Sequence, residues 1–259
     1  MVNSFTKVKT KGEVEAMRAS GRILASILAS LARQVEPGMS TLDLAIIAKK
    51  ELSSAGGEPA FLGYMGFPDV LCVSLNDEIV HGIPRKNRLI ESGDILSLDF
   101  GVKFKGMITD SAISLIVGKP NDPKDQKLVE QTKQALMAGI KVIKDGITVG
   151  DISNAIETVL NSNHYGIIRD MVGHGVGHQL HELPNIPNFG RPGSGPRLMR
   201  GMTIAIEPMA TLGDYHILTD ADHWTTRTAD GSLSAHFEHT VLITEDSFEI
   251  LTKINGNLE

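Results

Sequence analysis

Cysteine is nearly absent from this sequence, which has one, Cys72, in 259 residues. A single thiol cannot form an intramolecular disulfide framework or a cysteine-rich zinc module, and this usage fits a reducing compartment. Long apolar runs are also missing. The stretch "ILASILASLA" is short and contains serines, and the lysine-bearing N-terminus lacks the apolar segment of a signal peptide. We therefore expect a cytoplasmic protein that does not enter a membrane.

Positive charge is not concentrated anywhere in the chain. The formal net charge is -6, and lysine and arginine form no long stripe, so we predict no direct nucleic-acid binding. Hydrophobic residues make up 41% of the sequence. That fraction allows a sizeable core, in one large domain or in two tightly joined halves.

An internal repeat organises the chain. The segment "VEPGMSTLDLAIIAKKEL", from Val35, aligns with "IKDGITVGDISNAIETVL", from Ile143, at an offset of 108 residues (143 minus 35). In each segment a glycine turn leads to an aspartate, Asp43 or Asp151, that is expected to open a helix. Apolar residues then recur about every 3.6 positions, as in an N-capped amphipathic helix.

Another amphipathic pattern precedes each repeated segment. These patterns predict helices at about residues 13–34 and 125–144, and "TKGE" is a capping-box signal for the first. We therefore predict a single domain, 1–259, made of two related halves of about 10–118 and 119–250. Because each half supplies two helices and then strands, the expected fold class is α/β (α+β).

The same offset pairs two acidic residues in apolar strands. "GDILSLDFG" falls on "GMTIAIEPM", so that Asp99 corresponds to Glu207. Alternate side chains of a strand share a face, which places each acid opposite a row of apolar side chains. A carboxylate in so apolar a strand needs a compensating partner.

A second acid follows on each return strand. Lys105-Gly106 predicts a hairpin turn that brings Asp110 back beside Asp99, and Glu238 takes the place of Asp110 in the second half. Taken singly, such acids are more often caps or turn residues, but their matched positions in both halves favour a shared site. Four converging carboxylates cannot all stay ionised without a cation, so the pattern predicts a metal.

Three histidines, His174, His178 and His181, lie in "DMVGHGVGHQLHELPN". The first two have the spacing of a helical zinc pair, but the glycines around them disfavour a helix and the glutamate of that motif is missing. One histidine added to four carboxylates gives an oxygen-rich site suited to Mn, Fe, Co or Zn. A mononuclear zinc hydrolase built on all three histidines is the alternative.

Taken together, these residues resemble the type I methionine aminopeptidases. The resemblance covers essentially the whole chain and is carried, in family order, by "NDEIVHGIP", "LSLDFG", "ITDSA", "GHGVGHQLHELPNI", "GMTIAIEP" and "FEHT". It implies the duplicated, pseudo-twofold "pita-bread" fold, a central antiparallel sheet flanked by helices, and two divalent metal ions per chain (Co, Mn, Fe or Zn). The implied ligands are Asp99, Asp110, His174, Glu207 and Glu238, with Asp110 and Glu238 bridging.

The resemblance also implies catalytic roles. His81 would contact the scissile amide, His181 would polarise the carbonyl or stabilise the tetrahedral intermediate, and Glu207 would accept the proton of the attacking water. Two ions roughly 3.5 to 4 Å apart lower the pKa of a water between them and polarise the carbonyl. A polar loop residue is the favoured interpretation of the remaining histidines, which are His164, His178, His216, His223, His236 and His239.

The implied substrate pocket is largely aromatic. Besides His81 and His181, it comprises Phe61, Tyr64, Phe67, Cys72, Leu180 and Trp224. Leu180 stands where an aromatic residue is expected, and Phe61 stands where a small or sulfur-containing residue is common, which alters the expected shape of the pocket. The chain has one Trp and three Tyr, and two of these four fall at pocket positions, which favours a pocket over ordinary core packing.

The implied function is removal of the initiator methionine from nascent proteins whose second residue is small. Expected partners are nascent polypeptide N-termini near the ribosome exit, and we expect a monomer. Only 26 residues separate His181 from Glu207 (207 minus 181), too few for the helical insertion of type II enzymes. Two alternatives share the fold. One is an Xaa-Pro aminopeptidase or prolidase, which normally carries an additional N-terminal domain, and the other is a non-catalytic pita-bread binding protein, which would be expected to have lost ligands.

Overall fold

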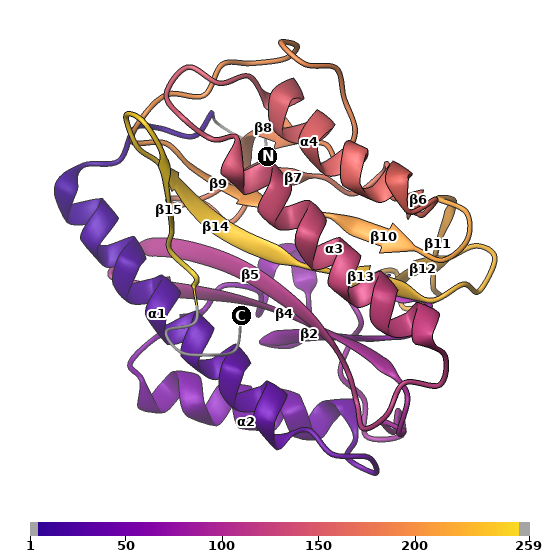
Figure 1. The fold of residues 1–259 in the computed structure, drawn as a ribbon. Coiled ribbons are helices and arrows are strands. Elements are labelled where there is room, and N and C mark those ends of the chain that lie inside the picture. The colour runs from indigo at the N-terminus through magenta and orange to yellow at the C-terminus, as the bar shows by residue number, and fades with distance from the viewer. Residues whose placement is uncertain (1–4, 254–259) are drawn as a thin grey trace.

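The computed structural model describes residues 5–253 (Figure 1). Within that range the helices come as two consecutive pairs, close to the predicted segments. They are α1 (Lys11–Gln34), α2 (Thr41–Ser54), α3 (Pro123–Lys141) and α4 (Val149–Ser162).

The helix starts follow the local sequence with one correction. The capping box predicted for α1 from "TKGE" is present. The expectation that Asp43 and Asp151 open α2 and α4 is wrong in detail, because Ser40 and Thr148 hold the N-cap positions. Each aspartate lies three residues further on and accepts a hydrogen bond from the backbone N–H of its cap, at 2.8 Å in α2 and 3.0 Å in α4. These contacts satisfy amide groups that the first helical turn leaves without partners.

The strands between the helix pairs, and after them, form one large sheet and two small ones. The strands are β1 (Glu58–Pro59), β2 (Leu71–Leu75), β3 (Glu78–Val80), β4 (Ile95–Phe104), β5 (Met107–Ile116), β6 (Gly166–Ile167), β7 (Gly173–Gly175), β8 (Glu182–Ile186), β9 (Thr203–Ile206), β10 (Met209–Thr211), β11 (Ile217–Thr219), β12 (Thr226–Thr228), β13 (Ser234–His236), β14 (Glu238–Ile243) and β15 (Phe248–Ile250). The large sheet has nine strands in the order β1-β4-β5-β14-β9-β7-β8, with β2 paired to β4 and β15 to β14. All its pairings are antiparallel, as expected.

The long β4–β5 hairpin turns where the sequence predicts. Lys105 and Gly106 have φ angles of 47° and 82°, the left-handed pair that a tight two-residue hairpin requires. The register pairs Asp110 with Gly101, two positions from Asp99. Because residues two apart share a face, the two aspartates are diagonal neighbours on the same side of the hairpin.

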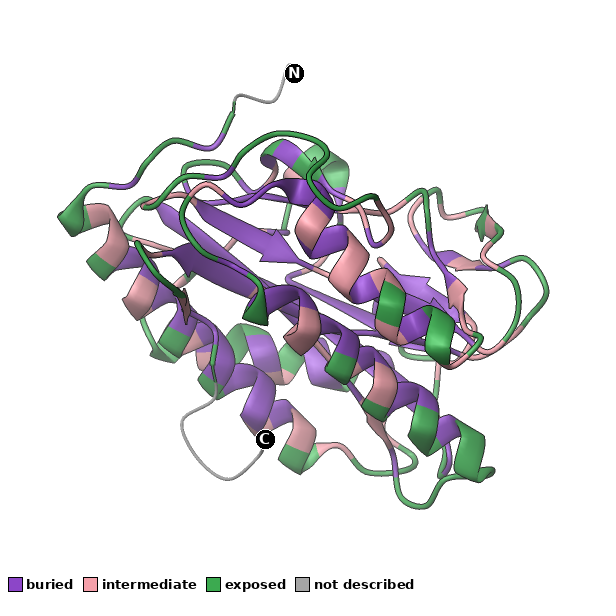
Figure 2. Ribbon diagram, turned by 45° about the horizontal axis from the view of Figure 1, so that its top comes forward, coloured by how far each residue is buried: buried purple, intermediate pink, exposed green. Residues whose placement is uncertain are grey.

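The helices pack on the sheet through two apolar cores. Leu24 and Leu44 of α1 and α2 belong to one core with Leu98 of β4, and Leu136 and Ile152 of α3 and α4 belong to the other. In Figure 1, α1 and α3 cross the near face of the sheet, and Figure 2 shows the sheet buried beneath them. The predicted fold, an antiparallel sheet flanked by helices, is confirmed, whereas the division at about residue 118 into two related halves stays a prediction.

The helices of the described residues are too short or too polar to cross a membrane. In residues 5–253, no helix combines the length and the mean hydropathy that a membrane-spanning segment needs.

Candidate metal centre and pocket

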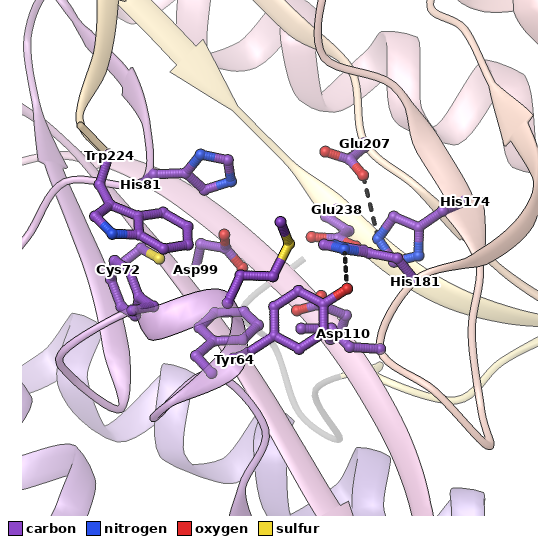
Figure 3. Close-up of a pocket in the computed structure, with 14 residues that line it drawn as sticks. Tyr64, Cys72, His81, Asp99, Asp110, His174, His181, Glu207, Trp224 and Glu238 are labelled. Carbon is purple, nitrogen blue, oxygen red and sulfur yellow. Dashed lines mark hydrogen bonds and ion pairs between the residues drawn. The ribbon is translucent and has the colours of Figure 1, made fainter. Parts of the chain in front are cut away.

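The acids singled out by the repeat lie on neighbouring strands. β4, β5, β14, β9 and β7 are adjacent in the sheet in that order. Asp99 lies in β4 and Asp110 in β5, Glu238 begins β14, Glu207 directly follows β9, and His174 lies in β7. Segments far apart in the sequence therefore each bring one acid or histidine to the same region, as Figure 3 shows.

Alternation along β4 decides which face of the sheet carries the acids. Leu98 and Phe100 pack into the core that also holds Leu24 of α1. Asp99, between them, points to the opposite face. The cluster is therefore on the side of the sheet away from α1, where the other acids line the same cavity.

The carboxylates are buried and lack enough internal donors. Asp99, Asp110 and Glu238 are 9%, 3% and 2% exposed, and each has one oxygen with no hydrogen-bond partner among the described residues. Burial raises the pKa of each of these carboxyls, and the negative charges of neighbouring acids raise the pKa of Asp110 and Glu238 further. Burial and the charge of Asp99 raise the pKa of Glu207 in the same way. Cations bound among such groups would stabilise their ionised forms.

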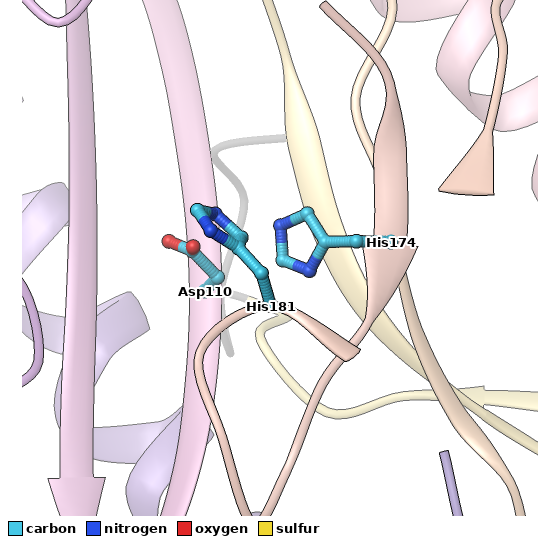
Figure 4. Close-up of side chains that lie close together, drawn as sticks. All are labelled: Asp110, His174 and His181. Atoms are coloured by element: carbon cyan, nitrogen blue, oxygen red, sulfur yellow. The ribbon is translucent and has the colours of Figure 1, made fainter. Parts of the chain in front are cut away.

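The donor atoms group closely enough to hold metal ions. Three sets have ligand atoms that all lie within 4.8 Å of one another, and they are Asp110, His174 and His181 (Figure 4), then His174, Glu207 and Glu238, then Asp99, Asp110 and Glu238. Asp110, His174 and Glu238 each belong to two of the three sets. Carboxylate oxygens joined by one imidazole form a donor set that Mn, Fe, Co and Zn accept. The residues present therefore fit divalent metal.

Three histidines face the cluster as neutral rings. Burial lowers the pKa of His174 to about 4 and that of His81 to about 4. For His181, burial lowers the pKa to about 3, helped by the repulsion that its protonated ring would meet from protonated His174 and His81. His181 stacks edge-on against His174 with ring centres 4.3 Å apart, and its Nδ1 is 3.0 Å from the Tyr64 hydroxyl. His81 has a φ of 60°, a left-handed backbone conformation that is uncommon for non-glycine residues.

The metal-ligand cluster forms one end of a small cavity, and aromatic side chains form the other. The cavity measures about 160 Å³. The phenyl ring of Phe67 meets the rings of Phe61 and Trp224 edge-on, at 6.4 and 5.2 Å. Every residue predicted for the site lines this cavity, which is bounded by Phe61, Tyr64, Met65, Phe67, Cys72, His81, Asp99, Asp110, His174, Leu180, His181, Glu207, Trp224 and Glu238.

The sequence interpretation missed one residue that lines the cavity and two that surround Glu207. Met65, 78% exposed, lines the cavity from a short 3-10 turn, Tyr64–Gly66. The other two surround Glu207. Asn188, fully buried, donates from Nδ2 to the backbone carbonyl of Glu207 at 3.1 Å. The interpretation of His236 and His239 as polar loop residues is wrong. His236 is a buried residue of β13 that lies beside Glu207, and His239 lies in β14, at the centre of the large sheet.

The loop that carries Leu180 and His181 is held from outside by a buried ion pair. The Oε1 of Glu182 accepts the backbone N–H groups of His178 and Gln179 at 2.8 and 2.9 Å. Its Oε2 lies 3.5 Å from the Nζ of Lys9, and both of these side chains are almost completely buried. The Nε2 of His178 lies 2.7 Å from the Oε1 of Glu13, and the His178 side chain does not line the cavity.

We expect Lys9→Met to lower the free energy of unfolding by about 3 kcal/mol, because it leaves the Glu182 carboxylate buried without its counter-charge. Urea unfolding measures this loss, and Lys7→Met, at an exposed lysine of the same segment, is the matched control. Adding Glu182→Gln to Lys9→Met is expected to recover part of the stability. Equal urea midpoints for the Lys9 and Lys7 variants would show that the ion pair does not hold the loop.

Comparison with known proteins gives one consistent family. Residues 15–245 match metallopeptidase family M24. Methionine aminopeptidase 1 of Bacillus subtilis (strain 168) is 45% identical over 246 residues, which cover 95% of this chain and 98% of that protein. The crystal structure of a methionine aminopeptidase from Thermotoga maritima has a TM-score of 0.94 and 43% identity, and the match covers 96% of this chain and 100% of that one.

A more distant structure shares the fold alone. The prolidase from Pyrococcus furiosus has a TM-score of 0.77 at 24% identity, and the match covers 96% of this chain but 66% of the prolidase. The resemblance to methionine aminopeptidases stated from the sequence is confirmed by the closer relatives. The family is one of metal-dependent peptidases, in agreement with the donor clusters of the cavity. On the match over residues 15–245 and these relatives, the chain belongs to metallopeptidase family M24.

Proposed function

We propose that this chain is a metallo-aminopeptidase that removes the N-terminal methionine of polypeptides, and in particular the initiator methionine of nascent proteins whose second residue is small. The observation that carries the proposal is the cavity itself, in which an acidic metal-ligand cluster adjoins an aromatic pocket. The relatives at 45% and 43% identity, both named methionine aminopeptidases, support it.

Two divalent ions are proposed for the cluster, drawn from Co, Mn, Fe and Zn. Their ligands would be Asp99, Asp110, His174, Glu207 and Glu238. Asp110, His174 and Glu238 each belong to two donor sets, and of these three only the carboxylates have two oxygens with which to bridge two ions, which supports a bridging role for Asp110 and Glu238. When bound, the ions would polarise the scissile carbonyl and lower the pKa of the attacking water.

Three side chains of the cavity are proposed to act directly on the water or the substrate. Glu207, whose carboxylate adjoins the cluster, would accept the proton of the attacking water. The hydroxyl of Tyr64 would donate to the Nδ1 of His181, so that the Nε2 of His181 carries its proton and donates to the oxygen of the tetrahedral intermediate. His81, on the far side of the cavity beside Trp224, would contact the scissile amide.

The pocket would select an unbranched apolar side chain. Phe61, Phe67 and Cys72 are buried and belong to one apolar cluster with Leu180. A thioether side chain fills such a pocket without needing a hydrogen-bond partner, whereas a charged side chain would be desolvated without compensation. Leu180, which is 3% exposed, lines the pocket with an apolar side chain that offers no hydrogen bond to a substrate.

The proposed setting follows from the proposed substrate. Nascent polypeptide N-termini near the ribosome exit would be the partners, the enzyme would act as a monomer, and its compartment would be the cytoplasm. Support comes from the relatives named methionine aminopeptidase and from the single, buried Cys72.

Peptide hydrolysis tests the proposal. The chelator-stripped protein is given Mn, Fe, Co or Zn and then Met-Ala-Ser, Pro-Ala-Ser or N-acetyl-Met-Ala-Ser, and the released amino acid is measured. Methionine should be released from the first peptide alone, because the site takes a free N-terminus and an apolar first side chain. Release of proline alone would replace the proposal with an Xaa-Pro activity, and no release with any metal would favour a binding protein.

A further inference from the structure

His236 is a buried imidazole that no step of the proposed mechanism uses. It ends β13 and is 1% exposed. Neither ring nitrogen has a hydrogen-bond partner among the described residues. A neutral imidazole has one donor and one acceptor, and buried polar atoms without partners are uncommon in folded proteins, so a ring in this state calls for an explanation.

The carboxylate of Glu207 lies beside this ring. The Nε2 of His236 lies 3.9 Å from the Oε2 of Glu207, and the Nε2 of His174 lies 3.4 Å from the Oε1 of the same carboxylate. Glu207 is thus bracketed by two imidazoles, one at each oxygen. His174 belongs to the metal-ligand sets, whereas His236 belongs to none of them. His236 also does not line the cavity, whereas Glu207 and His174 do, so it lies on the side of Glu207 away from the cavity.

The backbone of His236 is fixed more firmly than that of a surface residue. Its N–H donates to the Oγ of Ser114 at 2.8 Å, and the Oγ of Ser114 is 2.7 Å from the carbonyl oxygen of His236. Ser114 in turn contacts Ser97 of β4 at 2.7 Å, and β13 pairs with β10 so that His236 faces Met209. Met209 lies two residues after Glu207, so this pairing holds the backbone of His236 on the strand next to the segment that carries Glu207.

We propose that His236 is a positioning residue for Glu207: the 3.9 Å between its Nε2 and the Oε2 of Glu207 closes to a hydrogen bond when the metal centre is loaded, with Nε2–H as the donor, and this bond keeps the Oε1 directed toward His174 and the metal cluster. The inference rests on the proposed metal centre, because it assigns a partner to one of the proposed ligands. Hydrogen-bonded outer partners fix the orientation of a ligand, and their removal typically weakens metal affinity by about 10- to 100-fold.

Variants at position 236 separate the missing donor from a change of shape. His236→Phe keeps a ring of similar form, His236→Leu is smaller, and neither has a donor. His236→Gln keeps an N–H donor at the end of the side chain. His216→Leu, at an exposed histidine, is the matched control. Affinity for Co²⁺ is measured by calorimetry on the chelator-stripped full chain, together with the visible absorption of bound Co²⁺ and the separate values of kcat and KM.

The expected result is a loss of Co²⁺ affinity of about 10-fold or more in the Phe and Leu variants, with an altered Co²⁺ spectrum, and values within about 3-fold of the wild type for Gln. A lower kcat at nearly unchanged KM should accompany the loss, because Glu207 acts on the water. If the Phe and Leu variants bind Co²⁺ as His216→Leu does, with the same spectrum, the positioning role is wrong while the metal centre stands. If the wild type binds no Co²⁺, both the metal centre and this inference fail.

Discussion

Replacing Asp110 with asparagine is expected to lower kcat/KM for methionyl peptides on the order of 1000-fold, which corresponds to about 4 kcal/mol of transition-state stabilisation. Asp110 belongs to two of the three donor sets, so its carboxylate is proposed to serve both ions. Asparagine has nearly the same shape but offers one weaker oxygen ligand. Steady-state hydrolysis of Met-Ala-Ser with saturating metal measures the effect, with Asp246→Asn, at an exposed turn, as the control.

The same variant is expected to be more stable than the wild type when metal is removed. Burial and the charges of Asp99 and Glu207 act against an ionised Asp110, and an amide removes that repulsion. Each kcal/mol of relieved repulsion raises Tm by about 2 to 4 °C in a protein of this size. Added Co²⁺ should stabilise the wild type more than the variant. Full activity in Asp110→Asn, or a metal-free protein less stable than the wild type, would contradict a metal-ligand role.

His181→Ala is expected to lower kcat at least about 100-fold, the typical loss when one hydrogen-bond donor to a tetrahedral intermediate is removed. The affinity for metal should change little, because His181 is proposed to act on the substrate. His178→Ala is the matched control, since His178 lies on the same loop but contacts Glu13 outside the cavity. We expect less than a threefold change for that variant. Peptide hydrolysis assays measure kcat, and calorimetry on the same preparations measures metal affinity, so the two effects can be separated.

The pair of histidine variants also decides between two readings of the glycine-rich loop. A mononuclear zinc site built on His174, His178 and His181 requires all three imidazoles, so His178→Ala and His181→Ala would both abolish metal binding. The three donors do not converge in the structure, because the imidazole of His178 points to Glu13 while the other two line the cavity. Loss of metal binding in His178→Ala would overturn the carboxylate-rich centre.

The repeat was sufficient to predict where four acids meet. Strand alternation places Asp99 on the face opposite the core, and the offset of 108 residues (143 minus 35) between the two repeated segments places Glu207 at the matched position. The Lys105-Gly106 turn then fixes the register that puts Asp110 beside Asp99. The Asp99–Asp110 pair follows from local rules because it lies within one hairpin, and the repeat then transfers the same arrangement to Glu207 and Glu238.

The surroundings of the acids could not be predicted in the same way. His236 reads as an isolated polar residue before "FEHT", and only the pairing of β13 with β10 brings it to Glu207. Lys9 reads as one of several N-terminal lysines, yet it is buried against Glu182, far along the chain. Such contacts depend on how distant segments pack, and no pattern within either segment reports them. The pocket aromatics were placed by family resemblance, since spacing alone does not distinguish Trp224 from a core residue.

The central claim is that this chain cleaves N-terminal methionine with metal held by its carboxylate cluster. The most direct test is to titrate the chelator-stripped protein with Mn²⁺ or Co²⁺ while following both bound metal and the release of methionine from Met-Ala-Ser. We predict no release before metal is added, recovery of activity in step with binding, and saturation of binding at two ions per chain. Undiminished release of methionine in excess chelator would contradict the account.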